Sequence, residues 1–156
     1  MAVRVVRHLP VTMAPFTQTT ERHMPGIDLG NYLHGTSQSY HACVEVCAEC
    51  LVACEMCADA CLQEDNVKML ITCIQLDRDC ADACAAAIRT MARGGPLSAE
   101  LCRACAVACE ACAEECERHA SHHEHCRICA EVCRRCAEEC RRMAAAGSDR
   151  NERYAG

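Results

Sequence analysis

The chain has 156 residues, a length typical of one domain, and 19 of these residues are cysteine. Its formal net charge of −6 gives no basic surface for nucleic acid. No stretch approaches the roughly 18 consecutive apolar residues that span a membrane. With one Phe, three Tyr and no Trp, the chain also lacks the aromatic side chains that anchor most cores. We therefore expect no nucleic-acid partner and no membrane segment.

Residues 1–36 contain no cysteine and are rich in proline and glycine, so we expect an N-terminal arm that is partly helical or mobile. Arg7, His8 and Pro10 interrupt any apolar core of a secretory signal. This predicts a cytoplasmic, reducing location in which thiols stay free. The alternative is that the cysteines form a disulfide scaffold. Cysteines one turn apart on the same helix have Cβ atoms about 5–6 Å apart, which is too far for a disulfide bond. A disulfide needs roughly 3.5–4.5 Å.

Four stretches with helical periodicity follow the arm. The connections between them are short, so neighbouring helices are antiparallel. The sequence therefore predicts an all-α fold, an antiparallel up-down-up-down four-helix bundle over residues 37–146 with a frayed tail at 147–156. The four helices are expected at about 37–62, 66–93, 97–120 and 122–146.

Cysteines recur every three or four residues along the first, third and fourth of these helices. A mean spacing of 3.5 residues is typical of the helix face that contacts partner helices. Three such rows in one bundle would line a common interior with sulfur. The cysteines that we predict as metal ligands are Cys43, Cys47, Cys50, Cys54, Cys57, Cys61, Cys73, Cys80, Cys84, Cys102, Cys105, Cys109, Cys112, Cys116, Cys126, Cys129, Cys133, Cys136 and Cys140.

The second helix differs from the others. Its inward row begins at Met69 and ends at Met91, and it holds Asp77 among only three thiols. Because oxygen is a poor ligand for a soft metal, we expect Asp77 to be a hydrogen-bond partner or to point outward. This helix also carries a second apolar face, which predicts a second partner, either the arm or another subunit. The residues of that face are Val67, Leu70, Ile71 and Ile74.

Thiolates select Cu(I), Zn(II) and iron–sulfur clusters. Structural zinc sites take four ligands from compact turns and iron–sulfur ligands gather in loops, whereas these cysteines lie within continuous helices. Each Cu(I) ion neutralises one thiolate, so a filled interior avoids the cost of buried charge. We predict storage and buffering of several Cu(I) ions without enzyme activity. A general soft-metal (Zn) sequestrant and, less favoured, an iron–sulfur redox protein remain as alternatives.

The two ends of the bundle are expected to differ. If the cysteine rows are extended by the same spacing, His119 and His122 fall on them at one end of the bundle. We predict that this end is a mouth where the two imidazoles pass Cu(I) to the thiols. The alternative for both is a solvated turn, which is also what we expect for His123 and His125 because they fall out of phase. The opposite end continues with Tyr40, Met91, Ser98 and Met143, and we expect its methionines to plug the core.

Repeated C-x-x-x-C pairs, such as Cys43/Cys47 and Cys136/Cys140, occur on four helices rich in Ala, Glu and Arg. Because of these repeated pairs, the chain resembles the bacterial copper storage proteins, in particular their cytosolic branch, over residues 37–146. The resemblance implies a four-helix bundle that stores Cu(I) and assembles as a homotetramer. A copper chaperone or acceptor protein is a further partner that we expect for a copper store.

Overall fold

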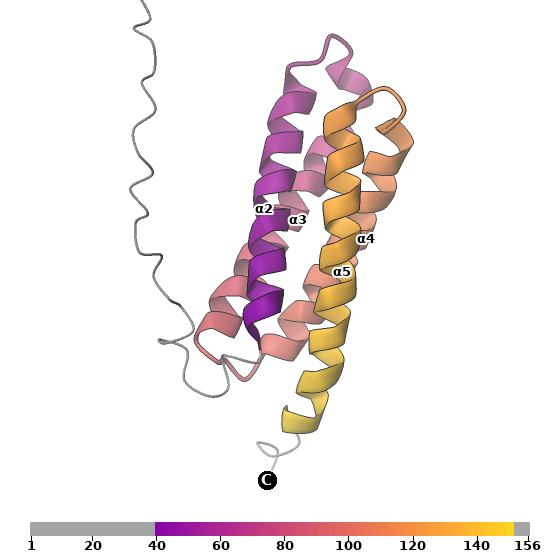
Figure 1. Ribbon diagram of the computed structural model, residues 1–156. Coiled ribbons are helices and arrows are strands. Elements are labelled where there is room, and N and C mark those ends of the chain that lie inside the picture. The colour runs from indigo at the N-terminus through magenta and orange to yellow at the C-terminus, as the bar shows by residue number, and fades with distance from the viewer. Residues whose placement is uncertain (1–39, 152–156) are drawn as a thin grey trace, which may run out of the picture.

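The computed structural model describes residues 40–151, so the predicted arm and the last five residues lie outside the described part. Four α-helices make up most of the described part. Figure 1 shows them side by side and running alternately up and down, with the first and the last in front of the two between them. The prediction of an all-α four-helix bundle is confirmed. The elements are α2 (His41–Leu62), the short 3₁₀ helix η2 (Val67–Met69), α3 (Ile71–Ala92), α4 (Ser98–His119) and α5 (Glu124–Asn151).

Two glycines end α3 close to the predicted residue 93. Gly94 has a φ of 63°, in the left-handed region that glycine adopts without steric cost. Its N–H donates to the carbonyl of Met91 at 3.0 Å, and the N–H of Gly95 donates to the carbonyl of Thr90 at 2.9 Å. This pair of hydrogen bonds satisfies the last carbonyls of the helix and turns the chain toward α4.

Several helix ends differ from the prediction. The helix predicted from residue 66 instead starts at Ile71 after the separate turn of η2, and α5 begins at Glu124 rather than near residue 122. The backbone of α5 also continues through Gly147 to Asn151. A glycine inside a helix costs only about 1 kcal/mol relative to alanine, which does not end the helix by itself.

The interior of the bundle is made of small side chains and sulfur. All nineteen cysteines are buried. Among the described residues, the fully buried side chains larger than cysteine are Leu70, Met91 and Asp77. Buried alanines such as Ala87 and Ala113 lie between the thiols and let the helices approach closely. A neutral thiol packs as a small apolar group, so this interior serves as a hydrophobic core.

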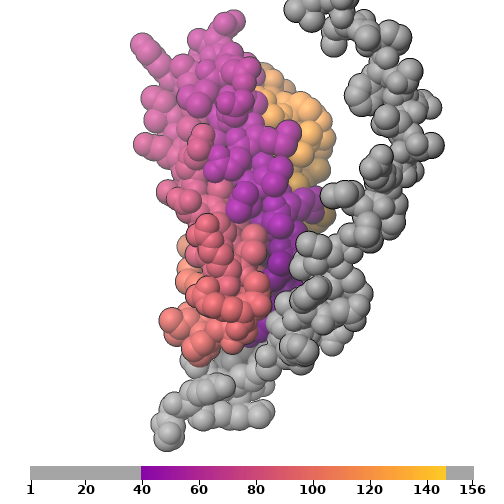
Figure 2. All heavy atoms as spheres, turned by 90° about the vertical axis from the view of Figure 1, so that its left-hand side faces the viewer, coloured from indigo at the N-terminus to yellow at the C-terminus, as the bar shows by residue number. Residues whose placement is uncertain are grey.

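Charged side chains cover the outside and link neighbouring helices. Arg78 of α3 lies 3.0 Å from Glu55 of α2, and Arg135 of α5 lies 2.7 Å from Glu49 of α2. These groups are about half exposed, so each pair contributes only about 0–1 kcal/mol. Figure 2 shows the side chains of α2 and α3 covering the interior on the face that they share. In the described part of the chain, no helix has the length and apolar character required to cross a bilayer.

The second apolar face of α3 is partly used inside the bundle. Leu70 is buried, and Ile74 packs against the core, whereas Ile71 is exposed. The prediction that Met69 begins the inward row is wrong, because its side chain is 70% exposed. Met69 belongs to η2, whose tighter winding breaks the phase of the following helix, and Leu70 enters the core in its place.

We predict that the reduced, metal-free protein is already helical. The buried neutral thiols, the alanine-rich helices and the glycine turn after α3 all stabilise the bundle without an ion. Small zinc domains behave differently, since metal binding supplies their folding free energy. Circular dichroism of the reduced protein in a Cu(I) chelator measures this directly. A coil spectrum that becomes helical only after Cu(I) is added would contradict the prediction.

Candidate metal centre

The thiols of different helices are in contact along the length of the bundle. All nineteen are free cysteines. The Sγ atoms of Cys47 and Cys140 are 3.5 Å apart, and those of Cys54 and Cys133 are also 3.5 Å apart. These distances exceed the roughly 2.05 Å of a disulfide bond, and they match the separation of sulfurs that share one metal ion.

Groups of four thiols, each with all Sγ atoms within 4.8 Å of one another, overlap along the interior. Neighbouring groups share one or two cysteines, so the thiols form a continuous path rather than separate sites. The overlapping groups are Cys47, Cys84, Cys105 and Cys136; Cys50, Cys84, Cys109 and Cys136; Cys50, Cys54, Cys80 and Cys133; and Cys54, Cys112, Cys129 and Cys133.

Asp77 connects this path to a further group of thiols at one end of the bundle. Its carboxylate accepts S–H hydrogen bonds from Cys112 at 3.1 Å and Cys129 at 3.4 Å, which belong to the continuous path. It also accepts from Cys116 at 3.6 Å and from Cys73 at 3.8 Å. Of the two positions expected for Asp77, the inward one with hydrogen bonds is confirmed. The end group consists of Cys57, Cys61, Cys73 and Cys126.

Burial favours the uncharged forms of the groups in the interior. Burial, together with the nearby Cys129 sulfur, raises the pKa of Asp77 to about 8, although the hydrogen bond from Cys112 acts in the opposite direction. The carboxyl group of Asp77 is therefore mostly protonated at neutral pH. Burial also raises the pKa of the Cys61 thiol. Neutral groups of this kind can pack without the cost of a buried, unpaired charge.

His125 is the histidine that contacts the thiols at this end. Its Nε2 lies 3.4 Å from Sγ of Cys61. The sequence prediction placed His125 out of phase, and that placement is wrong. His125 lies four residues before Cys129, one turn of the same helix, and this spacing was the signal that could have identified it.

Among the described residues, the two histidines predicted for the mouth form no hydrogen bond with a thiol. His122 is exposed, because α5 begins only at Glu124 and the helical period does not extend to the turn before it. His119 lies at the end of α4, as predicted, and its Nε2 is 3.2 Å from a carboxylate oxygen of Glu115. The structure brings His125, and not His122, next to the thiols.

The opposite end is filled by larger side chains. Tyr40, Met91 and Met143 are all buried, as the sequence predicted. The thiol of Cys102 donates a hydrogen bond to Sδ of Met91 at 3.5 Å, so the plug contacts the last thiols of the path. Ser98 is also buried, and its hydroxyl donates to the carbonyl of Gly95 at 2.6 Å.

Comparison with known proteins agrees with this sulfur-lined interior. A family model described as copper storage protein matches residues 36–145. The chain belongs to the copper storage protein family. The resemblance drawn from the cysteine pattern is therefore confirmed, and the match covers the whole thiol-lined part of the bundle.

Solved structures of copper storage proteins have the same fold. The protein from Streptomyces lividans loaded with 10 copper equivalents is 40% identical, with a TM-score of 0.71 over 76% of this chain and 96% of that chain. The Cu(I)-bound protein BsCsp3 of Bacillus subtilis is 47% identical, with a TM-score of 0.64 over 67% of this chain and 97% of that chain.

A curated relative, the cysteine-rich protein YhjQ of Bacillus subtilis (strain 168), is uncharacterized. It is 47% identical over 69 residues, which make up 44% of this chain and 64% of the relative. This chain thus spans a little under two thirds of the length of that relative.

Because the pKa of Asp77 is raised, we predict that the stability of the wild-type protein depends on pH differently from the stability of its Asp77→Asn variant. Since the folded pKa of about 8 exceeds the ordinary value of 3.8, folding takes up a proton between these values. The stability of the wild-type protein should fall relative to the variant as pH rises, by about 1 kcal/mol per pH unit between pH 5 and 7. Denaturant titrations of both metal-free, reduced proteins measure this difference. Parallel pH profiles would contradict it.

Proposed function

We propose that this chain is a non-catalytic, cytoplasmic store and buffer for Cu(I), with the nineteen cysteine thiolates as its ligands. The observation that carries the proposal is the overlap of four-thiol groups along the bundle. Shared sulfurs allow bridged ions, so many ions fit in one interior. Family membership supports storage, and the Streptomyces lividans relative is a cytosolic copper storage protein.

Cu(I) suits this interior better than Zn(II). A structural zinc site takes four ligands in a closed tetrahedron. Four thiolates around one Zn(II) retain a charge of −2, and such a site repeated along a buried path would accumulate charge at high cost. A Cu(I) ion for each thiolate leaves no net charge. Thiolate is also the ligand type that favours Cu(I).

We also propose that Cu(I) enters at the end that carries His125. The Nε2 of this residue lies beside Cys61, which belongs to the end group of thiols. A neutral imidazole holds Cu(I) less strongly than a thiolate does, so it can accept an ion and release it inward. The other end is obstructed by buried Tyr40, Met91 and Met143. His119 and His122 remain candidates for an outer step in this route.

We further propose a homotetramer, and a copper chaperone or acceptor protein that contacts the mouth. Family resemblance is the main support for both. An exposed apolar row in the groove between α2 and α5 supports self-association, because such surface is unfavourable in water. Val52, Met56 and Ile128 of this row are 54%, 68% and 46% exposed.

The capacity of the store is the first test. Anaerobic titration with Cu(I) against a competing chelator should saturate at about one ion per cysteine, because shared thiolates allow bridged ions. Saturation at one to four ions per chain would contradict storage. The same titration with Zn(II) should saturate at far fewer ions, since four thiolates are used for each ion.

Entry is tested by the rate of loading. The His125→Ala variant should load Cu(I) more slowly than the wild-type protein, with little change in capacity, because the residue that accepts the ion beside Cys61 is lost. The matched control is His41→Ala, which removes a partly exposed imidazole at the opposite end of the bundle. Stopped-flow loading of both variants measures the effect. If a Met91→Leu/Met143→Leu protein is slowed while His125→Ala is not, the ions enter at the other end.

Assembly is tested by light scattering, which should report a tetramer for the wild-type protein. A Met56→Glu substitution places a charge in the proposed contact and should shift the protein to smaller species. Val107→Glu is the matched control, because Val107 is similarly exposed but lies on α4. A wild-type monomer, or equal effects of both substitutions, would contradict the proposed contact.

A further inference from the structure

Three side chains at the mouth bring nitrogen and oxygen donors together outside the thiol path. Glu64 follows α2, His123 immediately precedes α5, and His125 lies in the first turn of α5. Oε1 of Glu64 is 3.1 Å from Nδ1 of His123 and 3.9 Å from Nδ1 of His125. The centroids of the two imidazole rings are 5.3 Å apart. One carboxylate oxygen is therefore within reach of two ring nitrogens.

These distances suit one tetrahedral ion. Bonds of about 2.0–2.2 Å from Zn(II) to imidazole nitrogen and carboxylate oxygen place two donor atoms about 3.4 Å apart. The observed separations of 3.1 and 3.9 Å lie on either side of that value. The two histidine side chains are only 14% and 21% exposed, so their rings are largely held in place by the surrounding protein.

The chemistry of these donors differs from that of the interior. Thiolates select the soft Cu(I) ion, whereas imidazole and carboxylate suit borderline divalent ions such as Zn(II). We propose that Glu64, His123 and His125 form a site for one Zn(II) ion at the mouth of the bundle, separate from the thiols. Three protein ligands leave the fourth tetrahedral position to water.

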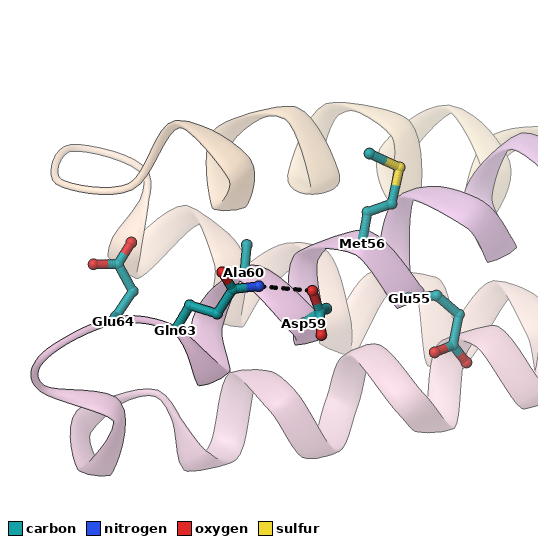
Figure 3. Close-up of a pocket in the computed structure, with 6 residues that line it drawn as sticks. All are labelled: Glu55, Met56, Asp59, Ala60, Gln63 and Glu64. Atoms are coloured by element: carbon teal, nitrogen blue, oxygen red, sulfur yellow. Dashed lines mark hydrogen bonds between the residues drawn. The ribbon is translucent and has the colours of Figure 1, made fainter. Parts of the chain in front are cut away.

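The surface beside the site favours a cation. Figure 3 shows Glu64 at the end of a hollow on α2, beyond the hydrogen-bonded pair of Asp59 and Gln63. The hollow is also lined by Glu55, which pairs with Arg78 at 3.0 Å. The carboxylate of Glu64 instead faces the two imidazoles. Carboxylates along this hollow attract divalent ions toward the proposed ligands.

Occupation of this site would change what His125 can do. A neutral imidazole that binds Zn(II) through Nδ1 carries its proton on Nε2. The Nε2 atom that faces Cys61 then has no free lone pair for Cu(I). Zn(II) at the mouth should therefore slow Cu(I) loading. This consequence rests on the proposed entry through His125, whereas Zn(II) binding itself does not.

The test uses the full chain saturated anaerobically with Cu(I), so that the thiols are occupied, and measures its copper content first. Equilibrium dialysis against Zn(II) should then show about one bound Zn(II) per chain. Glu64→Gln and His123→Ala should each weaken binding at least tenfold, since each removes one of three ligands. Glu45→Gln and His41→Ala are the matched controls, because they alter a His–Glu pair at the opposite end of the bundle, and Zn(II) binding to them should stay within twofold of wild type.

Co(II) as a probe identifies the donors, because sulfur ligands give an intense near-ultraviolet charge-transfer band and nitrogen and oxygen ligands do not. A spectrum without that band supports the site, and a thiolate spectrum overturns it. Unchanged Zn(II) binding in both Glu64→Gln and His123→Ala would also overturn it. A low copper content at the start counts against storage and not against this site. Zn(II) binding without slower Cu(I) loading supports the site and contradicts entry through His125.

Discussion

Contact between sulfur atoms of different helices is the constraint on which the rest of the structure depends. The same thiols have to form a packed core when the bundle is empty and a set of ligands when it is filled. Separations of 3.5–4.0 Å meet both needs, since they are van der Waals contacts for neutral thiols and lie within reach of a shared ion. The larger apolar side chains that are fully buried, Leu70 and Met91, consequently lie at the ends.

Charge divides the molecule into an inner and an outer region. Inside, burial favours a protonated carboxyl at Asp77 and neutral thiols in the empty bundle, and one Cu(I) for each thiolate keeps the filled bundle close to neutral. At the mouth, Glu64 and the histidines are partly exposed, so water stabilises charge there. A soft monovalent ion therefore belongs to the interior, and a divalent ion suits the mouth.

Periodicity was sufficient to predict the four helices and the burial of every cysteine, because a spacing of 3.5 fixes which face of a helix turns inward. It failed at Met69 and His122, which lie in η2 and in the turn before α5, where the helical phase does not hold. For Asp77, the sequence left open whether the side chain forms hydrogen bonds in the interior or points outward. The four thiols that contact Asp77 lie on three helices. The spacing of residues within one helix does not show how the helices are placed relative to one another.

X-ray absorption at the copper edge of the loaded protein tests the central claim most directly, because it reports the atoms bound to the metal throughout filling. Our account predicts a first shell made of sulfur at high loading. It also predicts copper–copper scattering that grows as ions are added, because neighbouring four-thiol groups share sulfurs. A first shell dominated by nitrogen or oxygen at high loading, or the absence of copper–copper scattering at saturation, would contradict storage in the thiol-lined interior.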